Sequence, residues 1–384
     1  MIDWIYTDEA LVEAARQKTG LDDFGGEEFR QGLSVLCETM EKSAGMNEAG
    51  RKQNWKRFEK LLELRLKIQA ALTRHPEILD REIRKPFFLT GLPRTGTSAL
   101  FNLLGMDPAT RPLLLWESFF PDPLEDLPKG EPDPRHLAMK AANEQMKDQN
   151  KDFSKIHFTS ADTPEECVLL MAATFEHVLM GIEPLMEPYR SYFEACDMRR
   201  PYAWYKNVLK LLDWQRPGDR WLLKSPAHLW ALDVLVEQYP DCCVILTHRN
   251  LAEVFASYCS MMNAVFAMNN CTPIEGLGPV VLEHIATSLE RGLEARERTD
   301  PTRFIDVRFD DFIADNIGTA EKIYAHFELP LEGEARAAME AHVSGNPMGK
   351  HGTHEYDLEQ YGLSLGMIRD RLGAYADRFE LEIG

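Results

Sequence analysis

A glycine-containing loop between an apolar run and a helical pattern is the strongest constraint on the fold of this chain. Residues 87–104 read FFLTGLPRTGTSALFNLL, in which the run 87–89 leads into Gly91 and Gly96, and helical periodicity follows from Ala99. Glycine lets a backbone approach an anion closely, and the N–H groups at the start of a helix point toward one. The spacing therefore predicts a buried strand, an anion-binding turn and a helix, in that order.

The loop differs at one decisive position from the phosphate-binding loop (P-loop) of nucleoside triphosphatases. The frame G-x-x-x-x-G-x-S runs from Gly91 to Ser98. Thr97 stands where those proteins carry the lysine that reaches the β- and γ-phosphates, and Arg94 lies inside the loop instead. We therefore expect the loop to hold a different phosphate group, with Arg94 supplying the positive charge.

Short apolar runs elsewhere indicate a P-loop-like parallel β-sheet flanked by helices, an α/β fold. The runs are continuously apolar, which is typical of parallel strands covered on both faces. Strands are expected at 86–90, 220–224, 242–247 and 303–307, and helices at 163–182, 201–214, 228–238, 251–268, 279–298 and 318–327. In such sheets ligands bind beyond the carboxyl ends of the strands, so the residues that follow each strand are the candidate site residues.

The chain before the first expected strand is predicted to be helical. Residues 54–79, NWKRFEKLLELRLKIQAALTRHPEIL, carry apolar side chains at a spacing of three to four. We expect residues 1–84 to form a helical N-terminal extension and residues 85–384 to form the α/β domain.

The composition excludes some classes of partner. The formal net charge of −19 over 384 residues disfavours nucleic acids and anionic membranes, so an anionic ligand needs a locally positive pocket. Seven cysteines without a C-x-x-C pair favour free thiols and a reducing compartment. The N-terminus lacks the pattern of a signal peptide, and no uncharged apolar stretch reaches about 18 residues. We expect a cytoplasmic protein without a transmembrane segment, and the oligomeric state, including a homo-oligomer, stays open.

Charged and hydroxyl side chains follow two further expected strands. Lys224 closes the run 220–224, while Arg249 follows the run 242–247 and Ser257 comes eight residues later. Taken singly, each is also compatible with an exposed charge or the polar face of a helix. An arginine, a hydroxyl and a helix start together suit a second anion. Two anion sites without the P-loop lysine fit a 3′,5′-bisphosphorylated adenosine better than a nucleoside triphosphate.

The segments TGLPRTGTS, LLKSP and HRNLAEVFAS together resemble the sulfotransferase superfamily, specifically its bacterial branch, over residues 86 to about 310. The resemblance implies 3′-phosphoadenosine 5′-phosphosulfate (PAPS) as the sulfuryl donor and no metal ion. It implies that Arg249 and Ser257 hold the 3′-phosphate and that Lys224 lies near the transferring sulfuryl group. It also implies that the 5′-phosphosulfate is held by Arg94, Thr95, Gly96, Thr97 and Ser98.

Two residues compete as the base that removes the proton from the acceptor hydroxyl. Glu117, in LLLWESFFPDP, is expected to be an inward-facing carboxylate, and some sulfotransferases use a glutamate in this region. His228 follows Lys224 by four residues, whereas cytosolic sulfotransferases place a histidine two residues after the equivalent lysine. Glu166, in TPEEC, fits a capping box with Thr163 and is assigned a structural role.

The expected reaction is transfer of a sulfuryl group from PAPS to a hydroxyl of a small-molecule or lipid-like acceptor. The helix 251–268, rich in Met and Phe, could line an apolar acceptor pocket, and the loop at 345–362 with Lys350, His351 and His354 is expected to form a lid over donor or acceptor. One alternative is a small-molecule or nucleotide kinase with a degenerate P-loop, for which Asp306 is the one candidate magnesium ligand. The other is a non-catalytic nucleotide-binding module.

Overall fold

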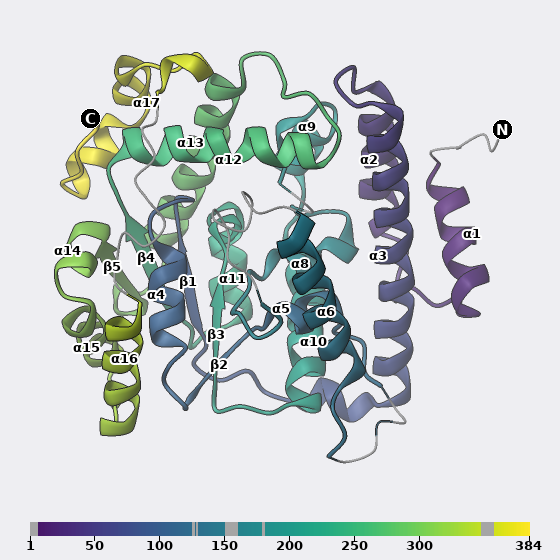
Figure 1. Ribbon diagram of the computed structural model, residues 1–384, viewed down its shortest axis with the longest axis horizontal. Helices are drawn as coiled ribbons and strands as arrows, with labels where there is room; N and C mark the ends of the chain where they lie inside the picture. The colour runs from purple at the N-terminus through teal and green to yellow at the C-terminus, as the bar shows by residue number, and fades with distance from the viewer. Residues whose placement is uncertain (1–6, 125–126, 128–129, 150–159, 179–180, 347–356) are drawn as a thin grey trace.

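The centre of the molecule is a five-stranded parallel sheet in the order β2-β3-β1-β4-β5 (Figure 1). The computed structural model describes the whole chain apart from residues 1–6, 125–126, 128–129, 150–159, 179–180 and 347–356. The strands are β1 (Phe87–Gly91), β2 (Thr110–Pro112), β3 (Arg220–Lys224), β4 (Cys243–His248) and β5 (Phe304–Arg308). The predicted parallel α/β sheet is confirmed. The strand that the sequence did not indicate, β2, is a three-residue edge strand, too short to show a pattern.

The strand order brings three candidate segments to one edge of the sheet. β1 lies between β3 and β4, with Leu89 opposite both Lys224 and Ile245, and Gly91 opposite Thr247. Because the strands are parallel, their carboxyl ends open on the same side. The loop that follows Gly91, the end of β3 and the residues after β4 are therefore neighbours in space.

Helices cover both faces of the sheet, as continuously apolar strands require. Successive strand residues point to opposite faces. Phe87 and Leu89 belong to an apolar cluster with Phe101 and Tyr324, and Phe88 belongs to the larger cluster on the other face. The helices are α1 (Asp8–Thr19), α2 (Phe29–Lys42), α3 (Glu48–Arg74), α4 (Thr97–Leu104), α5 (Leu115–Phe119), α6 (Pro134–Gln149), α8 (Val168–Met171), α9 (Tyr189–Ala195), α10 (Arg199–Gln215), α11 (Leu232–Gln238), α12 (Leu251–Met268), α13 (Leu277–Glu297), α14 (Phe309–Ala314), α15 (Asn316–His326), α16 (Gly333–Gly345) and α17 (Leu365–Arg378).

The N-terminal helices pack onto the larger of the two apolar clusters. Leu62 and Leu66 of α3 lie in the same cluster as Phe88 of β1. The buried Arg65 of α3 donates hydrogen bonds to the carbonyl oxygens of Phe24, at 2.9 Å, and Ala173, at 3.2 Å. In Figure 1, α2 and α3 lie along one side of the molecule. Because this core is continuous across residue 85, the division of the chain at that point stays a prediction.

The predicted helix over 163–182 is wrong. In the described part of this range, the structure has one α-helical turn, α8, followed by a 3-10 turn at Ala172–Thr174. Long-range hydrogen bonds hold the segment before α8 in an extended path: the Glu165 N–H donates to the Leu113 carbonyl at 2.8 Å, and the Cys167 N–H donates to the Lys224 carbonyl at 3.0 Å. Residues 170–177 are buried one after another, without the period of a helix. Their apolar side chains therefore reflect burial, and they were misread as one face of a helix.

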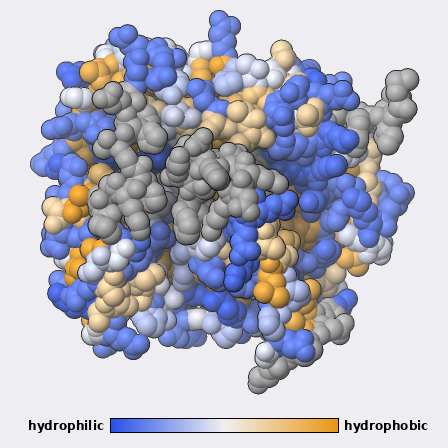
Figure 2. Space-filling model, viewed as in Figure 1, coloured by the Kyte–Doolittle hydropathy of each residue, from blue (hydrophilic) through white to orange (hydrophobic). Residues whose placement is uncertain are grey.

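Among the described residues, α12 is long and apolar enough to span a membrane by length and composition. It packs against α13 and α17, and eight of its residues are buried, including Phe255 and Phe266. Core helices pass the same test, and the contacts of α12 are those of a core helix. Figure 2 shows the hydrophobic areas of the viewed face as separate patches between hydrophilic ones.

Candidate functional site

The loop from β1 to α4 has the backbone of an anion-binding turn. Gly91 has φ +133°, and a Cβ atom there would lie 2.5 Å from the Thr247 carbonyl oxygen on β4. Gly96, with φ +81°, caps α4, and a Cβ atom there would meet the Phe309 ring. Arg94 also has positive φ, at 67°. The tight path directs the N–H groups of the first turn of α4, which have no acceptor within the helix, toward the sheet edge.

The side chain of Thr95 fixes this loop to β4. Thr95 is buried, its hydroxyl donates to the Leu92 carbonyl at 2.7 Å, and it lies 2.6 Å from the Thr247 hydroxyl. Both contacts are internal to the protein. The Thr95 hydroxyl is therefore already engaged, and the group that Thr95 can offer a ligand is its backbone N–H.

Arg94, Arg249 and Ser257 form one continuous group instead of two separate sites. Arg94 Nε donates to the Ser257 hydroxyl at 2.9 Å, and Arg249 Nη1 donates to the Arg94 carbonyl at 3.2 Å. Arg249 also pairs with Glu253, one turn along α12, and its guanidinium lies 4.2 Å from the centroid of the Phe309 ring. The structure thus brings together the loop, the end of β4 and the second turn of α12.

Lys224 lies between the loop and a carboxylate that the sequence analysis had set aside. Lys224 Nζ donates to the Ser98 hydroxyl at 3.1 Å and forms an ion pair with Glu166 Oε1 at 3.0 Å. The Lys224 side chain is 4% exposed and that of Glu166 is 30% exposed. A buried ammonium requires partners, and these two side chains provide them.

The capping box that explained Glu166 does not form. The helix α8 begins at Val168, and the Thr163 hydroxyl accepts a hydrogen bond from the Ser160 N–H at 2.9 Å. The mistaken assignment rested on the local T-P-E-E spacing alone. Two successive carboxylates directly before a buried apolar run were the feature that could have indicated a functional residue.

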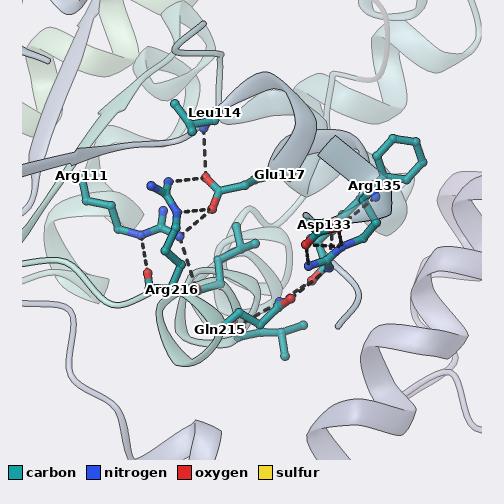
Figure 3. Close-up of polar contacts among 11 residues, drawn as sticks. Arg111, Leu114, Glu117, Asp133, Arg135, Gln215 and Arg216 are labelled. Atoms are coloured by element: carbon teal, nitrogen blue, oxygen red, sulfur yellow. Dashed lines mark hydrogen bonds and ion pairs between the residues drawn. The ribbon is translucent and has the colours of Figure 1, made fainter. Parts of the chain in front are cut away.

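Glu117 is inward-facing, as expected, but its geometry does not fit the predicted role of base. Arg111 Nη2 donates to it at 2.9 Å, Arg216 donates to both of its oxygens at 3.0 Å, and the Leu114 N–H donates at 3.2 Å (Figure 3). Arg111 on β2 is paired in register with Trp221 on β3. Trp221 lies three residues before Lys224, or about 10 Å along the strand. The carboxylate is therefore engaged toward the amino end of β3, away from the loop.

His228 also lies away from the sheet edge. Its ring is fully buried, packs against Phe88 at a centroid distance of 5.2 Å, and its Nδ1 atom lies 2.7 Å from the Tyr202 hydroxyl. Burial lowers the pKa of His228 to about 3. A histidine enclosed by aromatic rings in the core does not reach an acceptor, so this alternative base is not supported.

Asp306, the candidate magnesium ligand of the kinase alternative, is already paired. Arg296 donates to both of its oxygens, at 2.6 and 2.7 Å, and His248 Nε2 lies 2.9 Å from Oδ1. These partners hold the pKa of the Asp306 carboxyl well below its usual value, although burial acts in the opposite direction. In the described part of the chain, no three His, Cys, Asp or Glu side chains are grouped as metal ligands. Lys350, His351 and His354 lie outside the described residues.

Comparison with known proteins relates the chain to sulfotransferases. The model of the sulfotransferase family matches residues 86–333, which include all five strands. Omega-hydroxy-beta-dihydromenaquinone-9 sulfotransferase Stf3, from Mycobacterium bovis and from Mycobacterium tuberculosis, is 26% identical over 261 residues. That match covers 64% of this chain and 63% of Stf3, which is less than two thirds of the length of these relatives.

Two solved structures share the fold over nearly the whole chain. Sulfotransferase STF9 from Mycobacterium avium has a TM-score of 0.90 at 26% identity, covering 100% of this chain and 99% of that one. Sulfotransferase STF1 from Mycobacterium tuberculosis has a TM-score of 0.82 at 33% identity, covering 96% and 98%. With the family match extending over most of the chain, this protein belongs to the sulfotransferase family.

Proposed function

We propose that this chain transfers a sulfuryl group from PAPS to a hydroxyl of a small-molecule or lipid-like acceptor. The observation that carries the proposal is the continuous group of Arg94, Ser257 and Arg249 beside the lysine-free loop. It offers positive charge at two neighbouring positions, which suits a nucleotide with both a 5′- and a 3′-phosphate. The loop N–H groups with Arg94 and Ser98 would hold the 5′-phosphosulfate, and Arg249 with Ser257 the 3′-phosphate.

Lys224 would stabilise the charge that develops when the sulfuryl group leaves the 5′-phosphate. Its ammonium already contacts Ser98 at the start of α4, the helix that the 5′-phosphosulfate would face. By analogy with phosphoryl transfer, positioning and charge stabilisation should supply most of the rate enhancement.

The name of the relative Stf3 supports the acceptor class. That name specifies a hydroxylated menaquinone, a lipid-like molecule that carries a hydroxyl group. The half-buried face of α12 near the site offers apolar side chains, among them Met261 and Val265. We also propose a cytoplasmic location, which the seven free cysteines support because they would persist as thiols in a reducing compartment.

Arg249→Ala is expected to weaken binding of adenosine 3′,5′-bisphosphate by about 2 kcal/mol, or about thirtyfold, because a charge-assisted contact to the 3′-phosphate is lost. Binding of adenosine 5′-phosphosulfate, which has no 3′-phosphate, should change little. Titration calorimetry measures both affinities. Arg298→Ala is the matched control, since Arg298 also pairs with a glutamate four residues away but directly follows α13 and is 65% exposed. Equal losses for the two ligands would reject the assignment of Arg249.

Turnover is expected to survive treatment with EDTA. Arg94 and Lys224 would supply the positive charge that magnesium ions supply in kinases, and Asp306 is held by Arg296 and His248. Release of adenosine 3′,5′-bisphosphate from PAPS, measured before and after chelation, tests this. Release that EDTA abolishes and magnesium restores would contradict a metal-independent transfer, whereas magnesium-dependent ATP consumption without release from PAPS would favour the kinase alternative.

A further inference from the structure

Glu166 is the carboxylate that pairs with Lys224. Lys224 Nζ contacts both the Ser98 hydroxyl, at 3.1 Å, and Glu166 Oε1, at 3.0 Å. If the donor lies on the loop, as proposed above, the ammonium is next to the leaving phosphate. The carboxylate is then one side-chain contact from the leaving phosphate, and it is the more solvent-exposed of the two paired groups.

Backbone hydrogen bonds fix Glu166 in this place. The Cys167 N–H donates to the Lys224 carbonyl at 3.0 Å, and the Glu165 N–H donates to the Leu113 carbonyl at 2.8 Å. Cys167 is thereby attached to the last residue of β3, and Glu165 to the residue that directly follows β2. The Glu166 N–H donates to Glu165 Oε1 at 2.8 Å. A carboxylate held on anchored backbone is positioned for chemistry more accurately than one on an unattached loop.

Glu166 is accessible to solvent, whereas its partner Lys224 is buried. Its side chain is 30% exposed, whereas that of Lys224 is 4% exposed. In the described part of the chain, the titratable groups that interact with Glu166 include Lys224, Glu165, Cys167 and, on α12, Tyr258. Burial raises the pKa of Tyr258 well above its usual value, and burial raises that of Cys167 to about 12. The phenol and the thiol therefore stay protonated at neutral pH and do not compete as bases.

We propose that Glu166 is the general base of the transfer, an assignment that rests on the proposed function. The acceptor hydroxyl gives its proton to the Glu166 carboxylate while its oxygen forms a new bond to sulfur. The bond between sulfur and the 5′-phosphate oxygen breaks, and its electron pair stays on that phosphate beside Lys224. The products are the sulfate ester and adenosine 3′,5′-bisphosphate, and the proton leaves Glu166 for water through its exposed edge.

Glu166→Gln keeps the shape of the side chain and an oxygen for Lys224 but removes the basic site. Turnover of PAPS with farnesol, a lipid-like alcohol, should fall by about 10²–10⁴-fold, the usual share of general-base catalysis. Glu237→Gln is the matched control, because Glu237 of α11 also pairs with a basic side chain, Arg199, but is 62% exposed; its turnover should stay near the wild-type rate. Calorimetry should show that both variants bind adenosine 3′,5′-bisphosphate as the wild type does.

Two further measurements separate a base from a residue that only orients Lys224. In Glu166→Ala, added formate should restore part of the turnover, because a small carboxylate in the vacated space can take the proton. With 4-nitrophenol, which is largely ionised at pH 8, Glu166→Gln should lose much less activity than with farnesol.

The outcomes distinguish this assignment from the proposed function. Wild-type protein that releases no adenosine 3′,5′-bisphosphate from PAPS with either acceptor overturns the proposed function, before any variant is compared. If the wild type is active and Glu166→Gln keeps near-normal turnover of farnesol, the base assignment is overturned while the function stands. Equal losses with both acceptors and no rescue by formate would make Glu166 a positioning residue for Lys224.

Discussion

Lys224→Met is expected to lower turnover by about 10²–10³-fold, or about 3–4 kcal/mol of activation free energy, which is the usual effect of removing one preorganised donor from a developing negative charge. The ammonium is nearly inaccessible to water, with 4% of the side chain exposed, so no solvent cation can easily replace it. Methionine has a similar length and can keep the contact with the ring of Phe101, from whose centroid Lys224 Nζ lies 5.6 Å away. The loss should therefore be chemical and not structural.

Measurements of binding separate this effect from a loss of donor affinity. Adenosine 5′-phosphosulfate keeps the sulfuryl group on its 5′-phosphate and therefore carries less charge there than the transition state does. Its affinity for Lys224→Met should fall much less than turnover does. Ser98→Ala is a milder comparison, because it removes one neutral hydroxyl from the ammonium and leaves the charge in place. A Lys224→Met protein with near-normal turnover would place the transferring group elsewhere.

Lys224 and Glu166 should act as a unit if one stabilises the leaving phosphate and the other takes the acceptor proton. Groups that act together in one step show non-additive losses. The double variant Lys224→Met, Glu166→Gln should accordingly be little slower than the slower single variant. Fully additive losses would mean that the two side chains contribute independently, despite the 3.0 Å contact between them.

The sequence was informative where function depends on residues adjacent along the chain. The turn from β1 to α4 needs Gly91 and Gly96 for local backbone reasons, and the apolar strands β1, β3 and β4 could be recognised individually. Parallel order then predicted that the loop, Lys224 and Arg249 would share one edge of the sheet. The contacts among Arg94, Arg249 and Ser257 follow from that topology.

Residues whose role depends on distant partners were misjudged. Glu166 meets Lys224, which is 58 residues later in the chain, and no local pattern encodes that contact. The spacing of Thr163 and Glu166 suggested a helix cap instead, and the apolar residues that follow were mistaken for a helix over 163–182. Glu117 was recognised as an inward-facing carboxylate, but Arg216 lies 99 residues away, so its partners could not be read from its neighbourhood.

Glu117→Ala is expected to lower the free energy of unfolding by about 3–5 kcal/mol, because removing one member of a buried ion pair leaves its partner charge uncompensated. Arg111 is the charge at risk, since its side chain is 4% exposed and already packs on the Trp221 ring. Burial lowers the pKa of Arg111 to about 10, with Glu117 acting against that change. Arg216 is 47% exposed and can turn to solvent, so it should contribute less.

The free energies of unfolding of Glu117→Ala and of a control variant, Glu297→Ala, are compared by urea denaturation, which tests whether burial of the ion pair causes the loss. Glu297 also pairs with an arginine, Arg378, but its side chain is 61% exposed, so its removal should cost about 0–1 kcal/mol. The variant Glu117→Gln then decides between structure and catalysis, because the amide keeps an oxygen for Arg216 while losing all basicity. Under conditions where it is folded, it should bind adenosine 3′,5′-bisphosphate normally and turn over within a few fold of the wild type. A stable Glu117→Gln protein with turnover reduced by about 10²–10⁴-fold would return the role of base to Glu117 and remove it from Glu166.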